Sequence, residues 1–211
     1  MLVKICGVTN LEDALAAVEA GAGAVGFNFW RPGRRYLAPE RAAQIAAALP
    51  EGLWKVGVFV DEEVDTVLEI ARQVKLTALQ LHGAEPPTYL EQLGSYHKVK
   101  AIRMDSGFDA ARLTEYRSVT AFLLDGAGAT PGGTGSPFDW GRAVAAKKYG
   151  HVILAGGLTP ENVAEAVRRV RPWGVDVASG VESAPGRKDH TKVRAFVHAA
   201  RSAADESEEA R

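Results

Sequence analysis

Apolar and polar positions follow one rhythm along this chain, and the rhythm repeats eight times, about every 25 residues. Each repeat opens with a short run of apolar residues, which predicts a strand buried on both faces. It continues with apolar residues at helical spacing, which predicts a helix with one apolar face. The strands are expected at residues 2–6, 24–29, 54–60, 78–82, 99–102, 121–125, 151–155 and 174–178. The helices are expected at residues 11–20, 39–49, 63–74, 87–93, 110–116, 140–147, 160–170 and 189–204.

Eight strand–helix units in one domain predict a single-domain α/β fold, the (β/α)8 or TIM barrel, in which parallel strands close into a barrel covered by helices. We expect this domain to occupy residues 1–204, and residues 205–211 to form a charged, frayed C-terminal tail without apolar anchors. A doubly wound open sheet is the alternative architecture. No G-x-G-x-x-G motif follows the first strand, which argues against a dinucleotide-binding version of that sheet.

Composition and charge narrow the classes of partner. The chain has 211 residues, 46% of them hydrophobic, and a formal net charge of −1. It has neither a basic stripe nor a run of Lys and Arg, so the sequence predicts no nucleic-acid partner and no membrane surface as partner. No apolar stretch has membrane-spanning length, and the N-terminus lacks the layout of a signal peptide, which predicts a cytoplasmic protein. The single cysteine, Cys6, excludes an internal disulfide and a cysteine-built metal site.

The last two expected strands both end in small residues. Gly156-Gly157 follow the seventh strand and Ser179-Gly180 follow the eighth, and Thr159 is expected to cap the helix after the first pair. Bare backbone N–H groups near helix N-termini are a preferred place for a phosphate oxyanion. A tight turn is the better explanation for either pair alone, but two pairs in adjacent units favour a phosphate site. We call these four residues the phosphate cup.

Two other strand ends carry groups that can move protons. Cys6 ends the first expected strand and Asp125 ends the sixth. Successive side chains of a strand point to opposite faces, so Cys6 shares a face with Lys4, and Asp125 shares one with Leu123. If that face is the barrel interior, the thiol and the carboxyl face each other across the barrel mouth, the C-terminal ends of the strands, where such barrels place their reacting groups. The alternatives are a buried inert thiol and an ordinary turn aspartate.

Short motifs stand at most of these strand ends. They are Lys4-Ile5-Cys6-Gly7, Gln80-Leu81-His82-Gly83, Leu124-Asp125-Gly126, Gly132-Gly133-Thr134-Gly135 before Phe138-Asp139-Trp140, Leu154-Ala155-Gly156-Gly157-Leu158 before Asn162-Val163, and the run from Gly174 to Glu182. In order and spacing, from Lys4 to Asp189, the chain resembles the phosphoribosylanthranilate isomerase family of tryptophan biosynthesis. It departs from that pattern at Ala155 and Ala178, where the family often has Ser, so one hydroxyl donor beside the phosphate cup is missing.

The resemblance implies an Amadori rearrangement, which converts N-(5-phosphoribosyl)anthranilate to 1-(2-carboxyphenylamino)-1-deoxyribulose 5-phosphate. It implies Cys6 as general base and Asp125 as general acid, so the base must be a thiolate while the acid keeps its proton. It also implies Arg35 as the group that binds the anthranilate carboxylate, with Arg34 as the alternative. No metal or organic cofactor is expected, because the substrate's own nitrogen supplies the electron sink.

Three further residues at the mouth have open roles. We expect His82 and Gln80 to be structural hydrogen-bonding groups, and Asp176 to brace the eighth strand.

Three rival functions remain open. An indole-glycerol-phosphate synthase would call for lysine and glutamate at strand ends, and a sugar-phosphate epimerase for metal-ligating histidines and aspartates. A phosphate-ligand sensor would have the cup without a proton-transfer pair.

The composition bears on the oligomeric state. The chain has few Asn, Gln and Met but many Arg and Pro, which fits a heat-adapted source and favours a homodimer over a monomer.

Overall fold

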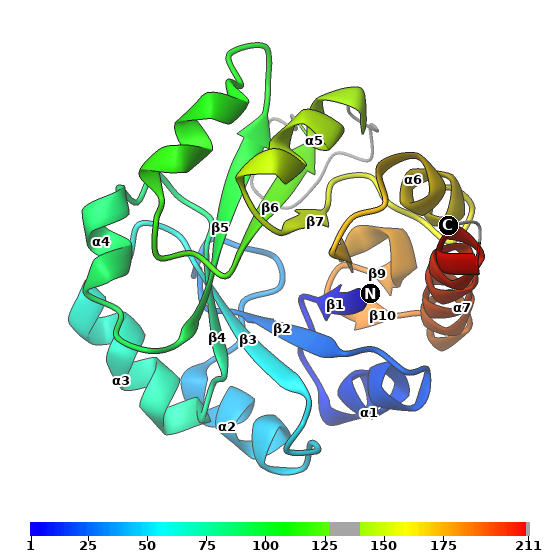
Figure 1. Ribbon diagram of the computed structural model, residues 1–211. Helices are drawn as coiled ribbons and strands as arrows, with labels where there is room; N and C mark the ends of the chain where they lie inside the picture. The colour runs from blue at the N-terminus through cyan, green and yellow to red at the C-terminus, as the bar shows by residue number, and fades with distance from the viewer. Residues whose placement is uncertain (127–139, 210–211) are drawn as a thin grey trace.

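The strands close into a barrel in chain order from β1 to β8, and β8 pairs with β1 (Figure 1). The computed structural model describes residues 1–126 and 140–209. Every neighbouring pair of barrel strands runs parallel. The strands are β1 Leu2–Cys6, β2 Ala24–Asn28, β3 Trp54–Phe59, β4 Ala78–Leu81, β5 His97–Met104, β6 Ala121–Gly126, β7 Val152–Leu154 and β8 Gly174–Val177. This closed barrel confirms the predicted single-domain (β/α)8 fold and shows that the open-sheet alternative is wrong.

Helices surround the barrel as an outer layer (Figure 1). They are α1 Leu11–Glu19, α2 Pro39–Ala47, α3 Val64–Val74, α4 Pro87–Glu91, the 3₁₀ helix η1 Ala110–Glu115, α5 Trp140–Ala146, η2 Lys147–Tyr149, α6 Val163–Val170 and α7 His190–Glu209. A short 3₁₀ helix, η3 Ser179–Val181, follows β8 at the mouth of the barrel. The apolar stripes of the outer helices explain the arrangement. In α6 the residues at helical spacing, Val163, Ala166, Val167 and Val170, are all buried against the sheet, as the pattern predicts.

Alternate residues of each strand fill the barrel interior. One interior cluster joins Ala24, Val56 and Ala78, and a second joins Val99, Ala101, Ala121, Leu123, Ile153 and Ala155. Leu2 packs against both clusters, so the interior face of β1 carries Leu2, Lys4 and Cys6. Small and branched side chains make this interior a packed core rather than a pore.

Three local predictions differ from the structure. The segment 110–116 forms the 3₁₀ helix η1 instead of an α-helix. Thr159 does not cap α6, which begins at Val163: Asn162 accepts a hydrogen bond from the Thr159 N–H and donates one to the Gly157 carbonyl, and so builds a turn before the helix. The last helix does not end at position 204 but runs to Glu209, where Ala203 is buried and Glu206 pairs with Arg168.

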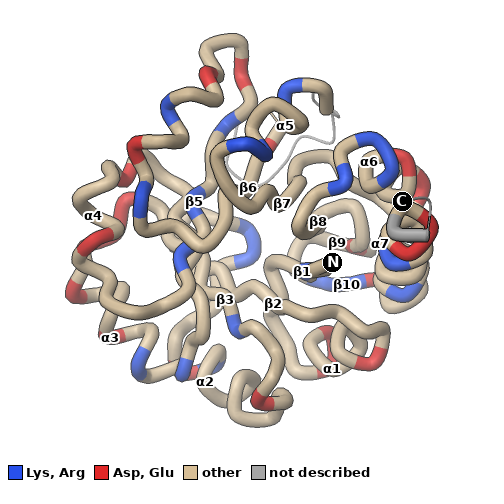
Figure 2. The backbone as a smooth tube through the Cα atoms, in the orientation of Figure 1, with Lys and Arg blue, Asp and Glu red and all other residues tan. Residues whose placement is uncertain are grey.

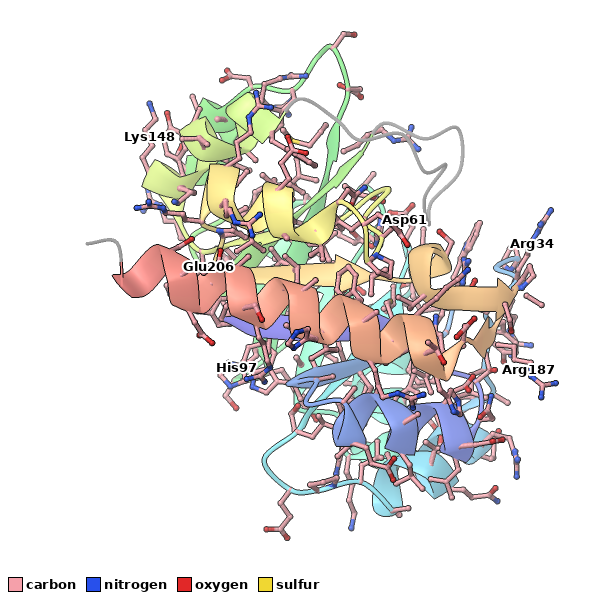
Figure 3. All side chains as sticks on the ribbon, turned by 90° about the vertical axis from the view of Figure 1, so that its right-hand side faces the viewer. Arg34, Asp61, His97, Lys148, Arg187 and Glu206 are labelled. Atoms are coloured by element: carbon pink, nitrogen blue, oxygen red, sulfur yellow. The ribbon has the colours of Figure 1, made fainter. Side chains whose placement is uncertain are left out.

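A small hairpin follows β8 and was not predicted. Strands β9 (Glu182–Ala184) and β10 (Arg187–Lys188) pair antiparallel, and Gly186 adopts a φ of 79° in the turn between them. The segment is too short and polar to show a strand pattern. The hairpin lies at the mouth end of the barrel, where Figure 3 labels both Arg187 and Arg34, while His97 at the start of β5 lies toward the opposite end.

Surface charge is mixed. Figure 2 shows Lys and Arg interspersed with Asp and Glu over the outer helices in this view. In the part of the chain that the structure describes, no helix has the length and apolar character to cross a membrane. The glycine-rich loop expected after β6, including Gly132-Gly133-Thr134-Gly135, lies outside the described residues.

Candidate active site

A cavity of about 680 Å³ opens at the C-terminal ends of the strands. The residues singled out in the sequence all line it: Cys6, Arg34, Arg35, Gln80, His82, Asp125, Gly156, Gly157, Asp176, Ser179 and Gly180. They come from six of the barrel strands or from the loops that follow them. The expectation that the thiol and the carboxyl share the interior face is confirmed, since both groups border the same cavity.

Cys6 stands at the end of β1, immediately before a turn that only glycine tolerates well. Gly7 has a φ of 70°, and a Cβ there would overlap the side chain of Arg35. The bare Cα of Gly7 therefore lets Arg35 pass close to the thiol. On the neighbouring strand, Gly26 leaves room for the sulfur, because a Cβ at that position would lie 2.9 Å from Sγ.

Opposing effects act on the thiol. Burial raises the pKa of Cys6, and the ammonium of Lys4 is the largest influence that lowers it. Asp176 adds to the rise, whereas Lys188 opposes it. The nearby cations therefore oppose the rise in the pKa of Cys6 that burial causes.

Asp125 lies at the end of β6 and takes part in a chain of polar side chains. Its Oδ2 is 3.3 Å from Nε2 of His82, and Nδ1 of His82 is 2.9 Å from the amide nitrogen of Gln80. In this arrangement the amide donates to Nδ1, so Nε2 carries the ring proton and donates to Asp125. His82 is thus a hydrogen-bonding group, as expected, but its partner is the candidate acid itself. Oε1 of Gln80 is buried and has no partner within the described part of the chain.

Arg35 is held by a carboxylate that the sequence did not suggest for this role. Nε and Nη2 of Arg35 donate to the two oxygens of Glu182 at 2.7 and 2.6 Å. Among the residues described, Nη1 has no partner. Arg34 also lines the cavity, but it is exposed and points away from the barrel in Figure 3, whereas Glu182 fixes Arg35.

Lys188 ties the same carboxylate to the end of β1. Its Nζ donates to Glu182 at 2.8 Å, to the carbonyl of Cys6 at 2.6 Å and to that of Ala178 at 3.2 Å. Burial alone would raise the pKa of Glu182, but Arg35 and Lys188 hold it below its ordinary value. Burial lowers the pKa of Lys188 despite the attraction of Glu182. Sequence reasoning missed both residues because these contacts span the hairpin and the far end of the chain.

The phosphate cup is a set of free backbone donors. Within the described residues, the N–H groups of Gly156, Gly157, Ser179 and Gly180 have no intramolecular acceptor. Gly156 and Gly157 have φ values of 76° and 70°, and a Cβ on Gly180 would overlap the carbonyl of Leu158. The donors belong to the turn after β7 and to η3, at the two strand ends where the sequence predicted them. Four unsatisfied N–H groups on one wall of a cavity are suited to an anion.

Over residues 1–126 and 140–209, no group of three His, Cys, Asp or Glu side chains is placed to hold a metal ion.

The fold and the site together define a class: (β/α)8-barrel enzymes whose reacting groups stand at the C-terminal strand ends. Within that class, the chain belongs to the family of N-(5'-phosphoribosyl)anthranilate isomerases, because the model of this family matches residues 3–199. The isomerase from Geobacter sp. (strain M21) is 53% identical over 196 residues, which cover 92% of this chain and 95% of the relative.

Solved structures agree with this assignment. The phosphoribosylanthranilate isomerase of Thermotoga maritima superposes with a TM-score of 0.91 at 43% identity, over 96% of this chain and 99% of that one. A second isomerase structure, in complex with reduced 1-(o-carboxyphenylamino)-1-deoxyribulose 5-phosphate, has a TM-score of 0.86 at 42% identity, over 96% of this chain and 100% of that one. The resemblance inferred from the strand-end motifs is confirmed.

Proposed function

We propose that the chain isomerises N-(5-phosphoribosyl)anthranilate to 1-(2-carboxyphenylamino)-1-deoxyribulose 5-phosphate, a step of tryptophan biosynthesis. The observation that supports it best is a single cavity that joins Cys6, Asp125 and the phosphate cup in a chain of this family. The complex formed by a relative with the reduced product fits a phosphorylated small molecule as ligand.

In the proposed mechanism, Asp125 is the general acid and Cys6 the general base. Asp125 gives its proton to the ring oxygen of the ribose as the bond between that oxygen and C1′ breaks, and the substrate nitrogen forms an iminium. The thiolate of Cys6 then removes the proton from C2′, and the electron pair moves toward the nitrogen to give an enolamine. Tautomerisation of the enolamine yields the ketone. Each proton transfer needs a positioned group and no cofactor.

The two ends of the substrate need separate sites. The phosphate is proposed to accept hydrogen bonds from the N–H groups of Gly156, Gly157, Ser179 and Gly180. The anthranilate carboxylate is proposed to bind Arg35, whose Nη1 is unpaired among the described residues while Glu182 fixes its other nitrogens. A guanidinium fixed in this way loses little freedom when the substrate binds.

The rival functions fit this site less well. A synthase mechanism needs a lysine at the cavity, but Lys4 is bound to Asp176 and is not among the lining residues. A sensor would bind phosphate without turnover. Steady-state turnover of phosphoribosylanthranilate, followed by the loss of its fluorescence, distinguishes an isomerase from a sensor. We expect catalytic turnover, and binding without turnover would overturn the proposal.

The chain is also proposed to form a homodimer and to work in the cytoplasm. The dimer is supported by the dimeric phosphoribosylanthranilate isomerase of Thermotoga maritima, whose monomeric variant matches this chain with a TM-score of 0.85 at 41% identity. The cytoplasmic location rests on the sequence prediction.

A further inference from the structure

A buried lysine lies directly beneath the candidate base. Lys4 and Cys6 are two residues apart on the interior face of β1, and the side chain of Lys4 is only 3% exposed. Cys6 lines the cavity, whereas Lys4 is not among the lining residues. The ammonium is therefore placed to affect the reaction through its neighbours rather than by contact with substrate.

Gly26 on the adjacent strand provides the space in which the two side chains approach. The register pairs Cys6 with Gly26. A Cβ on Gly26 would lie 2.9 Å from Sγ of Cys6 and 3.1 Å from Nζ of Lys4, so the sulfur and the nitrogen border the same gap. Any larger residue at this position would push one of them away.

Asp176 holds the ammonium from the other side. The register pairs Lys4 with Asp176 across β1 and β8, and Nζ donates to Oδ1 at 2.8 Å. Burial alone would lower the pKa of Lys4, but Asp176 and Cys6 raise it above its ordinary value. The side chain therefore stays charged at neutral pH in a place where an unpaired ammonium would be strongly disfavoured.

We propose that Lys4 is a positioning residue whose ammonium, fixed by Asp176 beside the gap at Gly26, supplies the positive charge that stabilises the thiolate of Cys6. This inference rests on the proposed function, in which Cys6 removes the proton from C2′. The charged groups that face Cys6 are Lys4 on β1, Asp176 on β8, Lys188 on β10 and Arg35 after β2.

Among these groups Lys4 opposes most strongly the rise in the Cys6 pKa that burial causes. Lys188 acts in the same sense, but its ammonium already donates to Glu182 and to two carbonyls. Arg35 is committed to Glu182 through two hydrogen bonds. Lys4 has one carboxylate partner, and its remaining protons are available to the sulfur.

The thiol itself gives the direct readout. Cys6 is the only cysteine of the chain, so the ultraviolet absorbance of the thiolate, followed against pH and corrected for tyrosine ionisation by subtracting the same protein with Cys6→Ser, reports this site. Lys4→Met should move the midpoint of the titration to higher pH and slow alkylation by iodoacetamide about tenfold or more at neutral pH. Asp176→Asn should move the midpoint in the opposite direction, because it removes a negative charge.

Lys100→Met is the matched control. Lys100 has the same 3% side-chain exposure as Lys4 and also pairs with a carboxylate, Glu85, at 2.8 Å. It alternates with the interior residues Val99 and Ala101, so it lies on the outer face of β5. Its removal should leave the midpoint unchanged. A midpoint in Lys4→Met that equals the wild-type value or lies below it would overturn the proposal.

Two further comparisons keep the test independent of folding and of function. If circular dichroism shows that Lys4→Met does not fold, the double variant K4M/D176N is compared with Asp176→Asn. These two variants differ only at Lys4. The double variant leaves no unpaired charge, because both partners of the ion pair are replaced by neutral residues. The double variant should then have the higher midpoint, and equal midpoints would refute the role of Lys4.

Thiol titration needs no substrate, so it decides on Lys4 separately from wild-type turnover, which tests the proposed function. If both hold, Lys4→Met should lower kcat at neutral pH and regain part of it at higher pH, a recovery that a purely structural defect would not produce.

Discussion

At the scale of single residues, the two neighbouring arginines of the loop after β2 differ in what fixes them. Arg35 is 17% exposed and forms two hydrogen bonds with Glu182, whereas Arg34 is exposed and has no hydrogen-bond partner among the described residues. The sequence predicted that one of the pair binds a carboxylate but left the choice open. The choice depends on Glu182, which lies 147 positions away in sequence, and no local pattern reports such a contact.

The first prediction separates these two arginines. Arg35→Ala should weaken binding of the reduced product analogue by about 1.5–3 kcal/mol, the usual contribution of a hydrogen bond to a charged group. Arg34→Ala, the matched control, should change the affinity by less than about 0.5 kcal/mol. Isothermal titration calorimetry of both variants checks this. Equal losses in the two would mean that Arg35 has no special role.

The place of Cys6 and Asp125 at the barrel mouth was predictable from local pattern, whereas their roles as base and acid were inferred from the family resemblance. Cys6 and Asp125 end buried strands of the same parallel sheet, and alternation fixes the face on which each side chain lies. The hydrogen bond from His82 to Asp125 was not predictable in this way, because it joins the ends of two strands that are not neighbours in the barrel.

At the scale of elements, the turn after β7 approaches the end of β6 so closely that glycine is required. A Cβ on Gly156 would overlap the backbone nitrogen of Gly126 and lie 2.6 Å from Oδ1 of Asp125. The turn that forms part of the phosphate cup therefore also packs against the candidate acid. The glycines were visible in the sequence, but Thr159 was predicted as the helix cap. Asn162 fixes the turn through hydrogen bonds to the backbone of Thr159 and Gly157, and these bonds exist only in the folded chain.

The second prediction uses this close approach. Gly156→Ala should lower turnover about 10²-fold, because Asp125 and the strand end must shift to admit the methyl group. Gly94→Ala is matched in backbone strain, with a φ of 63° against 76°, but a Cβ there meets nothing within 4 Å. It should cost about 1–2 kcal/mol of stability and leave turnover unchanged. The relevant data are kcat and thermal unfolding of both variants, and similar kcat values would rule out the proposed crowding.

The third prediction concerns the hairpin of β9 and β10, which Glu182 fastens to the barrel. The pKa of Glu182 is lowered in the folded protein, so its contribution to stability is present above its ordinary pKa of 4.5 and is lost as the pH falls below that value. The pair of Glu182 and Lys188 is almost fully buried, so Glu182→Gln should cost about 3–5 kcal/mol at neutral pH.

Thermal unfolding measured from neutral to acidic pH tests this contribution. The difference in stability between wild type and Glu182→Gln should shrink as the pH drops below 4.5, because the wild-type carboxylate then becomes protonated. A difference that stays constant over the whole range would show that the charge of Glu182 is not what holds the hairpin.

At the scale of the whole molecule, the eightfold rhythm of apolar runs was enough to predict the barrel. Each βα unit is local, and eight such units have few ways to bury both faces of a parallel sheet. The exact ends of elements were less predictable. The last helix passes position 204: Ala203 is buried and Glu206 pairs with Arg168 of α6, and both features depend on how α6 and α7 lie together.

The fourth prediction is the homodimer. Light scattering during size-exclusion chromatography at micromolar concentration should give a mass twice that of the chain. The expectation follows from the dimeric relative of Thermotoga maritima and from a composition that fits heat adaptation. A mass equal to one chain under these conditions would end this proposal, and it would leave the proposed reaction untouched because every candidate site residue belongs to one barrel.

The account's central claim is that proton transfer at the barrel mouth depends on the thiol of Cys6, and Cys6→Ser tests it most directly. Serine has nearly the same volume, but an alkoxide is far harder to form near neutral pH than a thiolate. Turnover of phosphoribosylanthranilate should fall about 10²-fold or more, while affinity for the reduced product analogue stays close to that of the wild type. Near wild-type turnover would leave Cys6 as a packing residue, and the base would then have to be sought at Asp176 or His82.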